Sequence, residues 1–113
     1  MMRYMLLINI DKSAPPLQKG EEDAILQGHK RFEAEFAGKI VDTERLRPEA
    51  EARCVRLQAG RPLVTDGPFA ETKEVLGGFY VVECGTMDEA IECAGKIPLR
   101  EGRAIEVWPT WPR

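Results

Sequence analysis

The residues of this chain most suited to chemistry lie in one polar segment, positions 66–74, which reads DGPFAETKE. Asp66 opens it, and a carboxylate can serve as a general acid or base when its surroundings shift its pKa. Gly67 permits backbone angles closed to other residues and Pro68 fixes its own φ, so the turn would hold Asp66 and Phe69 stiffly. Two roles stay open for Asp66: a carboxylate in a cleft, or an acceptor that caps the turn through its own backbone.

His29 is the one histidine of the sequence and the second candidate for acid–base work. At about 100° per residue it lies within the helical arc defined by Ile25, Phe32 and Phe36, so it should face the core. An imidazole with a pKa near neutrality could act as a general acid or base beside a carboxylate. The alternative is a core histidine whose nitrogens bond to backbone groups. The proposed catalytic pair is therefore Asp66 and His29.

The rest of the polar segment could bind a polar small molecule. The candidate ligand-binding residues are Gly67, Pro68, Phe69, Glu71 and Lys73. A short charged run on a loop is, however, often only a solvated surface with weak ion pairs. Both interpretations stay open for this group.

No metal or cofactor is expected. The three cysteines are odd in number and far apart, and no Cys-x-x-Cys pair suggests a zinc site or a redox dithiol. They should be reduced and mostly buried. No glycine-rich phosphate loop opens a helix, which argues against a nucleotide cofactor. These cysteines are Cys54, Cys84 and Cys93.

Composition restricts the possible partners. With 113 residues, 43% of them apolar, the chain should form one domain over residues 1–113. A formal net charge of −3 gives no broad positive field for nucleic acid or an anionic membrane. The apolar run 4–10 is far shorter than the roughly 20 residues of a membrane helix. We therefore expect a cytoplasmic protein that binds neither nucleic acid nor membrane.

Hydrophobic patterning outlines the elements that would position the polar segment. The runs 4–10, 39–45, 52–58, 62–65, 77–83 and 104–108 predict strands, with a tight turn at 59–61. A helix is expected over 21–36 and a second after Thr86, where Glu89 completes a capping-box spacing. Gly77 and Gly78 suggest a bulge or a close backbone approach. The second helix should carry an apolar stripe before Pro98, formed by Met87, Ala90, Ile91, Ala94 and Ile97.

The order of these elements predicts an α+β fold, a ferredoxin-like split βαβ subunit with an extra hairpin arm. Right-handed crossovers would place both helices on one face of the sheet and leave the other face bare. Both central strands are apolar on both faces, and a soluble monomer rarely exposes such a surface. We therefore expect a homodimer packed sheet against sheet, a dimeric α+β barrel.

Residues 63–79, LVTDGPFAETKEVLGGF, resemble the signature of the DGPF-domain branch of the YCII-related family. The similarity extends from the first strand to Glu106 and Val107. The resemblance implies a dimeric α+β barrel with a cleft beside each sheet and no established reaction. It also implies a setting near extracytoplasmic-function sigma factors. The His-Asp pair proposed for YCII-like proteins carries over here to His29 and Asp66.

Two functions follow as hypotheses. The first is a cytosolic protein that binds a small-molecule ligand and uses Asp66 and His29 in acid–base chemistry. The alternative is a non-catalytic regulatory or protein-interaction module, in which segment 66–74 and an exposed sheet edge recognise another protein. The distance between His29 and Asp66 should help to discriminate them, because acid–base cooperation needs contacts of about 2.6–3.2 Å or one bridging water.

Overall fold

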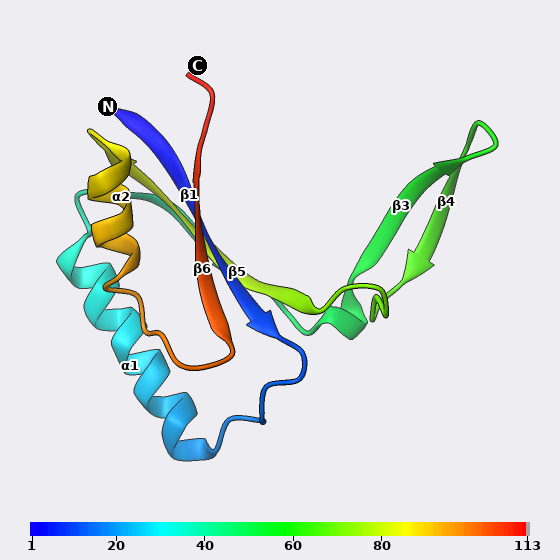
Figure 1. The fold of residues 1–113 in the computed structure, drawn as a ribbon, viewed down its shortest axis with the longest axis horizontal. Helices are drawn as coiled ribbons and strands as arrows, with labels where there is room; N and C mark the ends of the chain where they lie inside the picture. The colour runs from blue at the N-terminus through cyan, green and yellow to red at the C-terminus, as the bar shows by residue number, and fades with distance from the viewer. Residues whose placement is uncertain (113) are drawn as a thin grey trace.

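The computed structural model describes residues 1–112, which form an α+β fold with one main sheet, two α-helices and a projecting two-stranded arm (Figure 1). The elements, in chain order, are β1 (Met2–Asp11), α1 (Lys19–Glu35), β2 (Ile40–Arg45), the 3-10 turn η1 (Glu49–Glu51), β3 (Arg53–Gln58), β4 (Arg61–Asp66), β5 (Glu74–Cys84), α2 (Met87–Ala94) and β6 (Arg103–Pro109). The expected strand and helix sequence is confirmed, with β5 starting three residues earlier than its apolar run.

The main sheet has the strand order β2-β5-β1-β6, and every neighbouring pair is antiparallel. This order, with α1 after β1 and α2 after β5, is the ferredoxin-like split βαβ arrangement predicted from the sequence. Strand β1 is a central strand, as predicted, since it pairs with β5 on one side and β6 on the other.

Both helices cover the same face of this sheet (Figure 1). On that face Tyr4, Leu6 and Tyr80 are almost fully buried, and Phe32 of α1 packs with its ring centroid 4.8 Å from that of Tyr80. The alternate residues of β1 and β5 point away from the helices, as the period of a strand requires. The core therefore lies between the helices and one sheet face.

Helix α2 begins as predicted, and its predicted apolar stripe is wrong at one position, Ile91. Thr86 Oγ1 accepts a hydrogen bond from the Glu89 backbone N–H at 3.2 Å, which caps its first turn. Ile91, predicted to face the core, is 53% exposed, so that assignment was wrong. Cys93 is buried in its place, as a free thiol whose pKa burial raises to about 11. The sheet-facing set is Ala90, Cys93, Ala94 and Ile97, which follows the i, i+3, i+4, i+7 spacing of one helical face.

The glycine pair of β5 marks a bulge, as predicted. Gly78 pairs with Ile8 and Leu76 pairs with Asn9, so Gly77 is the extra residue. A Cβ on Gly78 would lie 2.9 Å from the Glu44 carbonyl oxygen of β2. Glycine is therefore required at position 78 by the close approach of the neighbouring strand.

Strands β3 and β4 form an arm that projects away from the helices (Figure 1). Their turn uses positive φ at Ala59 and Gly60. Val55 pairs with Val64 and Leu57 with Pro62, and these alternate positions place all four side chains on one face of the arm. Leu57 is 76% exposed. The arm thus carries an apolar face that no other element in residues 1–112 covers.

A second uncovered surface lies on the main sheet, on the side away from the helices, and we call it the open face. Met5 pairs with Val81 and Leu7 with Phe79, at the positions that alternate with the buried residues. Trp108, opposite Met5, is 55% exposed. The open face is therefore apolar along both central strands.

None of the helices in residues 1–112 is both long and apolar enough to span a bilayer.

Candidate functional site

A chain of hydrogen bonds joins α1 to the buried face of the sheet. The Nδ1 atom of His29 lies 2.8 Å from the hydroxyl of Tyr80, and that hydroxyl donates to Glu33 Oε2 at 2.9 Å. A phenol has one hydrogen, so the bond from His29 must use an Nδ1–H group. The neutral ring then carries its free lone pair on Nε2, which has no hydrogen-bond partner in residues 1–112.

The sequence positions these groups by simple periodicities. His29 and Glu33 are four residues apart on α1 and therefore share one helix face. Tyr80 alternates with Val82 along β5, which directs it toward the same space. The rings of His29 and Tyr80 stack with centroids 5.9 Å apart and an interplanar angle of 19°. The inward orientation predicted for His29 is confirmed.

Burial and charge together favour the neutral imidazole. Partial burial lowers the pKa of His29 below its ordinary value, and the charges of Arg103 and Arg45 lower it further, while Glu33 raises it. Burial and the hydrogen bond to Glu33 raise the pKa of Tyr80, so the phenol stays protonated and remains a donor. At neutral pH the arrangement therefore presents an unprotonated Nε2, the form that can accept a proton.

Asp66 lies elsewhere in the chain. It ends β4, its side chain is 75% exposed, and it pairs with Arg53 Nε at 2.9 Å. The arm that carries it projects away from α1 (Figure 1). The structure does not join Asp66 to His29 by a hydrogen bond within the single chain. A catalytic role for Asp66 stays a prediction.

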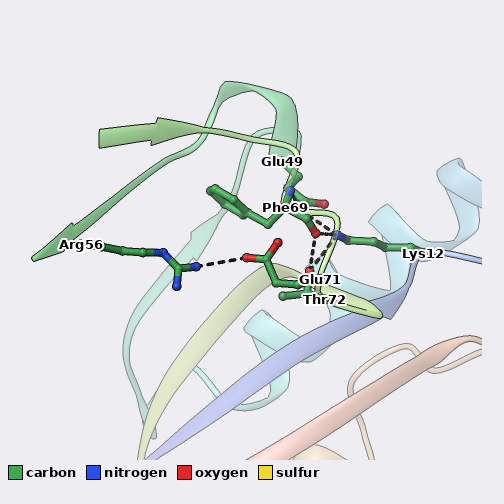
Figure 2. A network of polar contacts seen from close by, with 6 residues as sticks. All are labelled: Lys12, Glu49, Arg56, Phe69, Glu71 and Thr72. Carbon is green, nitrogen blue, oxygen red and sulfur yellow. Dashed lines mark hydrogen bonds and ion pairs between the residues drawn. The ribbon is translucent and has the colours of Figure 1, made fainter. Parts of the chain in front are cut away.

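Segment 66–74 is fastened to the body of the domain by Lys12 (Figure 2). Lys12 Nζ donates to the Phe69 carbonyl at 2.6 Å, to Thr72 Oγ1 at 2.7 Å and to Glu49 Oε1 at 2.8 Å. Glu49 also accepts the backbone N–H of Phe69, and its pKa is lowered by these two partners. This network holds the loop against η1 and the residue that follows β1.

The other residues proposed for ligand binding also make contacts that stiffen the base of the arm. The Gly67 N–H donates to the Ala52 carbonyl at 2.9 Å, and a Cβ on Gly67 would overlap the Glu49 carbonyl oxygen. Glu71 pairs with Arg56 at 3.1 Å, as Figure 2 shows. Pro68 follows Gly67 through a cis peptide bond, and the Lys73 carbonyl accepts from the Lys12 backbone N–H at 3.0 Å. A ligand-binding role for Gly67, Pro68, Phe69, Glu71 and Lys73 stays a prediction.

Sequence reasoning missed the two partners of His29. Glu33 could have been found, because a carboxylate four residues after an inward histidine on a helix reaches the same space. Tyr80 had no such signal, since only the packing of α1 on β5 brings it to His29. The same holds for Arg45 and Arg103, whose charges act on His29 from β2 and β6.

Comparisons with known proteins agree with this fold. The YCII-related domain family matches residues 2–112 of the chain. An uncharacterised protein of Rhizobium meliloti (strain 1021) is 38% identical over 96 residues, which cover 82% of this chain and 77% of that relative. Because the family match covers nearly the whole sequence, the chain belongs to the YCII-related domain family.

Proposed function

We propose that the protein binds a small organic molecule beside α1 and exchanges a proton with it through Nε2 of His29. The observation that carries this proposal is the hydrogen-bonded chain from Glu33 through Tyr80 to His29 Nδ1. A base of this kind needs a fixed tautomer, a fixed ring orientation and a pKa below the working pH. Tyr80 and Glu33 fix the tautomer and the ring orientation. Burial, with the charges of Arg103 and Arg45, lowers the pKa of His29.

Each member of the chain has its own part in the transfer. His29 takes a proton from the substrate on Nε2 and becomes an imidazolium. Tyr80 keeps the ring in place, and the negative charge of Glu33 favours the imidazolium through the Tyr80 hydroxyl. The nearby charges of Arg45 and Arg103 oppose it, so the proton is readily returned. Tyr80 and Glu33 are therefore positioning residues, and His29 is the catalytic residue.

The proposal is tested by finding the molecule and then removing the base. Native mass spectrometry of the purified protein should reveal a retained small molecule. In deuterium oxide, NMR of that molecule should show exchange of one of its carbon-bound hydrogens. General acid–base groups contribute roughly 10²–10⁴-fold to rates. The His29→Gln variant should therefore catalyse this hydrogen exchange at least about 10²-fold more slowly than the wild type.

Two controls keep the result interpretable. Lys30→Gln changes an exposed neighbour on α1 and should leave the exchange rate unaltered. Asp66→Asn tests the carboxylate on the arm, and we expect only a small effect because the Asp66 side chain is exposed and pairs with Arg53. Full activity in His29→Gln would refute the assignment. A large loss of exchange activity in Asp66→Asn but not in His29→Gln would indicate that the catalytic residue is Asp66 in the polar segment.

We also propose that the open face is the interface of a homodimer and that the chain belongs to the DGPF branch of its family. The apolar pairs Met5–Val81 and Leu7–Phe79 support the dimer, because two such faces can cover each other around a two-fold axis. The run Asp66-Gly67-Pro68-Phe69 supports the branch.

The arm favours a second candidate function, a protein-interaction module. Val55 and Val64, 66% and 59% exposed, sit on its apolar face. An isolated two-stranded hairpin is only marginally stable in water, so packing against a partner would stabilise it. A module of this kind would lose its partner in a Leu57→Lys variant and keep it in His29→Gln.

A further inference from the structure

A cavity of about 230 Å³ opens between the loop after β1 and the start of β6. Two arginines, Arg100 and Arg103, line it together with the apolar loop 14–17. Lys12 also lines it but is already engaged by two oxygen atoms of the polar segment, from Phe69 and Thr72, and by Glu49 Oε1 of η1. Arg100 is paired with Glu21, so the cation of this lining without an ion pair in residues 1–112 is Arg103.

The two arginines have more hydrogen-bonding capacity than their neighbours satisfy. Arg100 Nη1 lies 2.8 Å from Glu21 Oε2, but the contact is too poorly aligned for a hydrogen bond, and this buried atom has no other acceptor in residues 1–112. Arg103 forms no ion pair with any carboxylate in that range. Burial and the like charges of Arg100 and Arg45 lower the pKa of Arg103.

The two carboxylates that line the cavity, Asp11 and Glu101, form no ion pair with Arg100 or Arg103 within residues 1–112. Asp11 accepts hydrogen bonds from the N–H and the hydroxyl of Ser13, at 2.8 and 2.7 Å. Glu101 is exposed and forms no ion pair within residues 1–112. Like charges held close together in a partly buried site favour the binding of an anion. The features that favour an anion here are therefore the unpaired guanidinium of Arg103 and the unsatisfied Nη1 atom of Arg100.

We infer that this cavity binds the carboxylate or phosphate group of a small molecule through the guanidinium groups of Arg103 and Arg100. The planar fork of an arginine matches both kinds of anion in two-point contact. The cavity is smaller than the roughly 300–1,000 Å³ of drug-sized pockets, which fits a metabolite-sized ligand. The charge of Arg103 acts on His29, so an anion bound at Arg103 would lie close to the proposed base. The idea that this anion is part of the substrate therefore rests on the proposed function.

Calorimetric titration with inorganic phosphate, malonate and its neutral analogue malonamide tests the inference. We expect at least one of the two anions to bind saturably and malonamide not to bind. Hydrogen bonds to charged groups contribute about 1.5–3 kcal/mol, so Arg103→Met should weaken anion binding by roughly 10-fold or more. Arg61→Met removes the same charge from the exposed tip of the arm and should leave the affinity unchanged. Arg103→Lys, which keeps the charge but loses the fork, should lie between wild type and Arg103→Met.

A second readout locates the anion relative to His29. In NMR titrations of the wild-type protein, saturating malonate or phosphate should raise the pH at which the histidine ring titrates, because the anion offsets the charge of Arg103. Binding with no change at the ring, or equal binding of malonamide, would overturn the inference, as would unchanged affinity in Arg103→Met.

The test of anion binding can fail or succeed independently of the test of His29 as the base. His29→Gln should alter anion affinity by no more than about twofold, since the two groups are not in direct contact. Loss of exchange activity in His29→Gln with intact malonate binding supports both ideas. Absence of anion binding to wild type refutes the anion site alone.

Discussion

Replacing Phe32 with alanine should lower the free energy of unfolding by about 3–5 kcal/mol, the range for large aromatic residues in cores. Phe32 is 1% exposed and is one of the largest fully buried side chains of the domain. Its ring contacts Tyr80 edge-on at 4.8 Å and Phe36 at 5.0 Å between centroids. The variant removes the main contact that presses α1 onto the sheet, so it should also loosen His29 from Tyr80.

Urea denaturation followed by circular dichroism measures the loss. Leu26→Ala is the matched control, because Leu26 is on the same helix but is 46% exposed and should cost much less. A loss below about 1 kcal/mol for Phe32→Ala, in the range of ordinary substitutions, would contradict the packing described for α1.

Replacing Val81 with glutamate should convert the proposed homodimer into monomers. Val81 lies on β5 at the centre of the open face, opposite Met5 of β1. In a two-fold dimer each interface would receive two new carboxylates without partners. An uncompensated buried charge costs about 3–5 kcal/mol, so dissociation should rise by roughly 10²–10³-fold or more.

Size-exclusion chromatography with light scattering at micromolar concentration gives the assembly of each variant. Ile91→Glu is the control, since Ile91 is exposed on α2, which lies on the opposite side of the sheet. Wild type and Ile91→Glu should both run as dimers. A wild-type species of 12.7 kDa would refute the proposed interface.

Much of the fold could be predicted because its signals are local. Short stretches of a few residues predict single elements: the apolar run predicts β1, the Thr86 cap predicts the start of α2, and the glycine pair predicts the bulge of β5. The order of those elements then limits the topology to the split βαβ arrangement. The inward direction of His29 followed from the helical period alone.

The site could be predicted only in part because its contacts join distant segments. The Tyr80 hydroxyl meets His29 and Glu33 across the gap between β5 and α1, and no sequence spacing encodes that distance. The stiff turn at Asp66 fits either a cleft carboxylate or a turn cap, and stiffness alone does not predict where the arm points. Lys12, which binds the polar segment, is 57 positions away from Phe69 in the sequence.

The error at Ile91 has the same origin. Ile91 and Cys93 are both apolar residues of one short helix, and either could complete an amphipathic stripe in the sequence. Tertiary packing selected the face with Ala90, Cys93 and Ala94, whose small side chains let α2 approach the sheet closely.

NMR of the ring nitrogens of the single histidine, in isotope-labelled protein, tests the proposed base most directly. We expect the neutral ring to carry its hydrogen on Nδ1 and to titrate below the ordinary histidine pKa of about 6.5. Tyr80→Phe should abolish this tautomer preference, whereas Tyr4→Phe, which removes the other tyrosine hydroxyl, should preserve it. A hydrogen on Nε2 in the wild-type protein, or a ring that titrates at an unshifted pH, would contradict the assignment of His29 as the base.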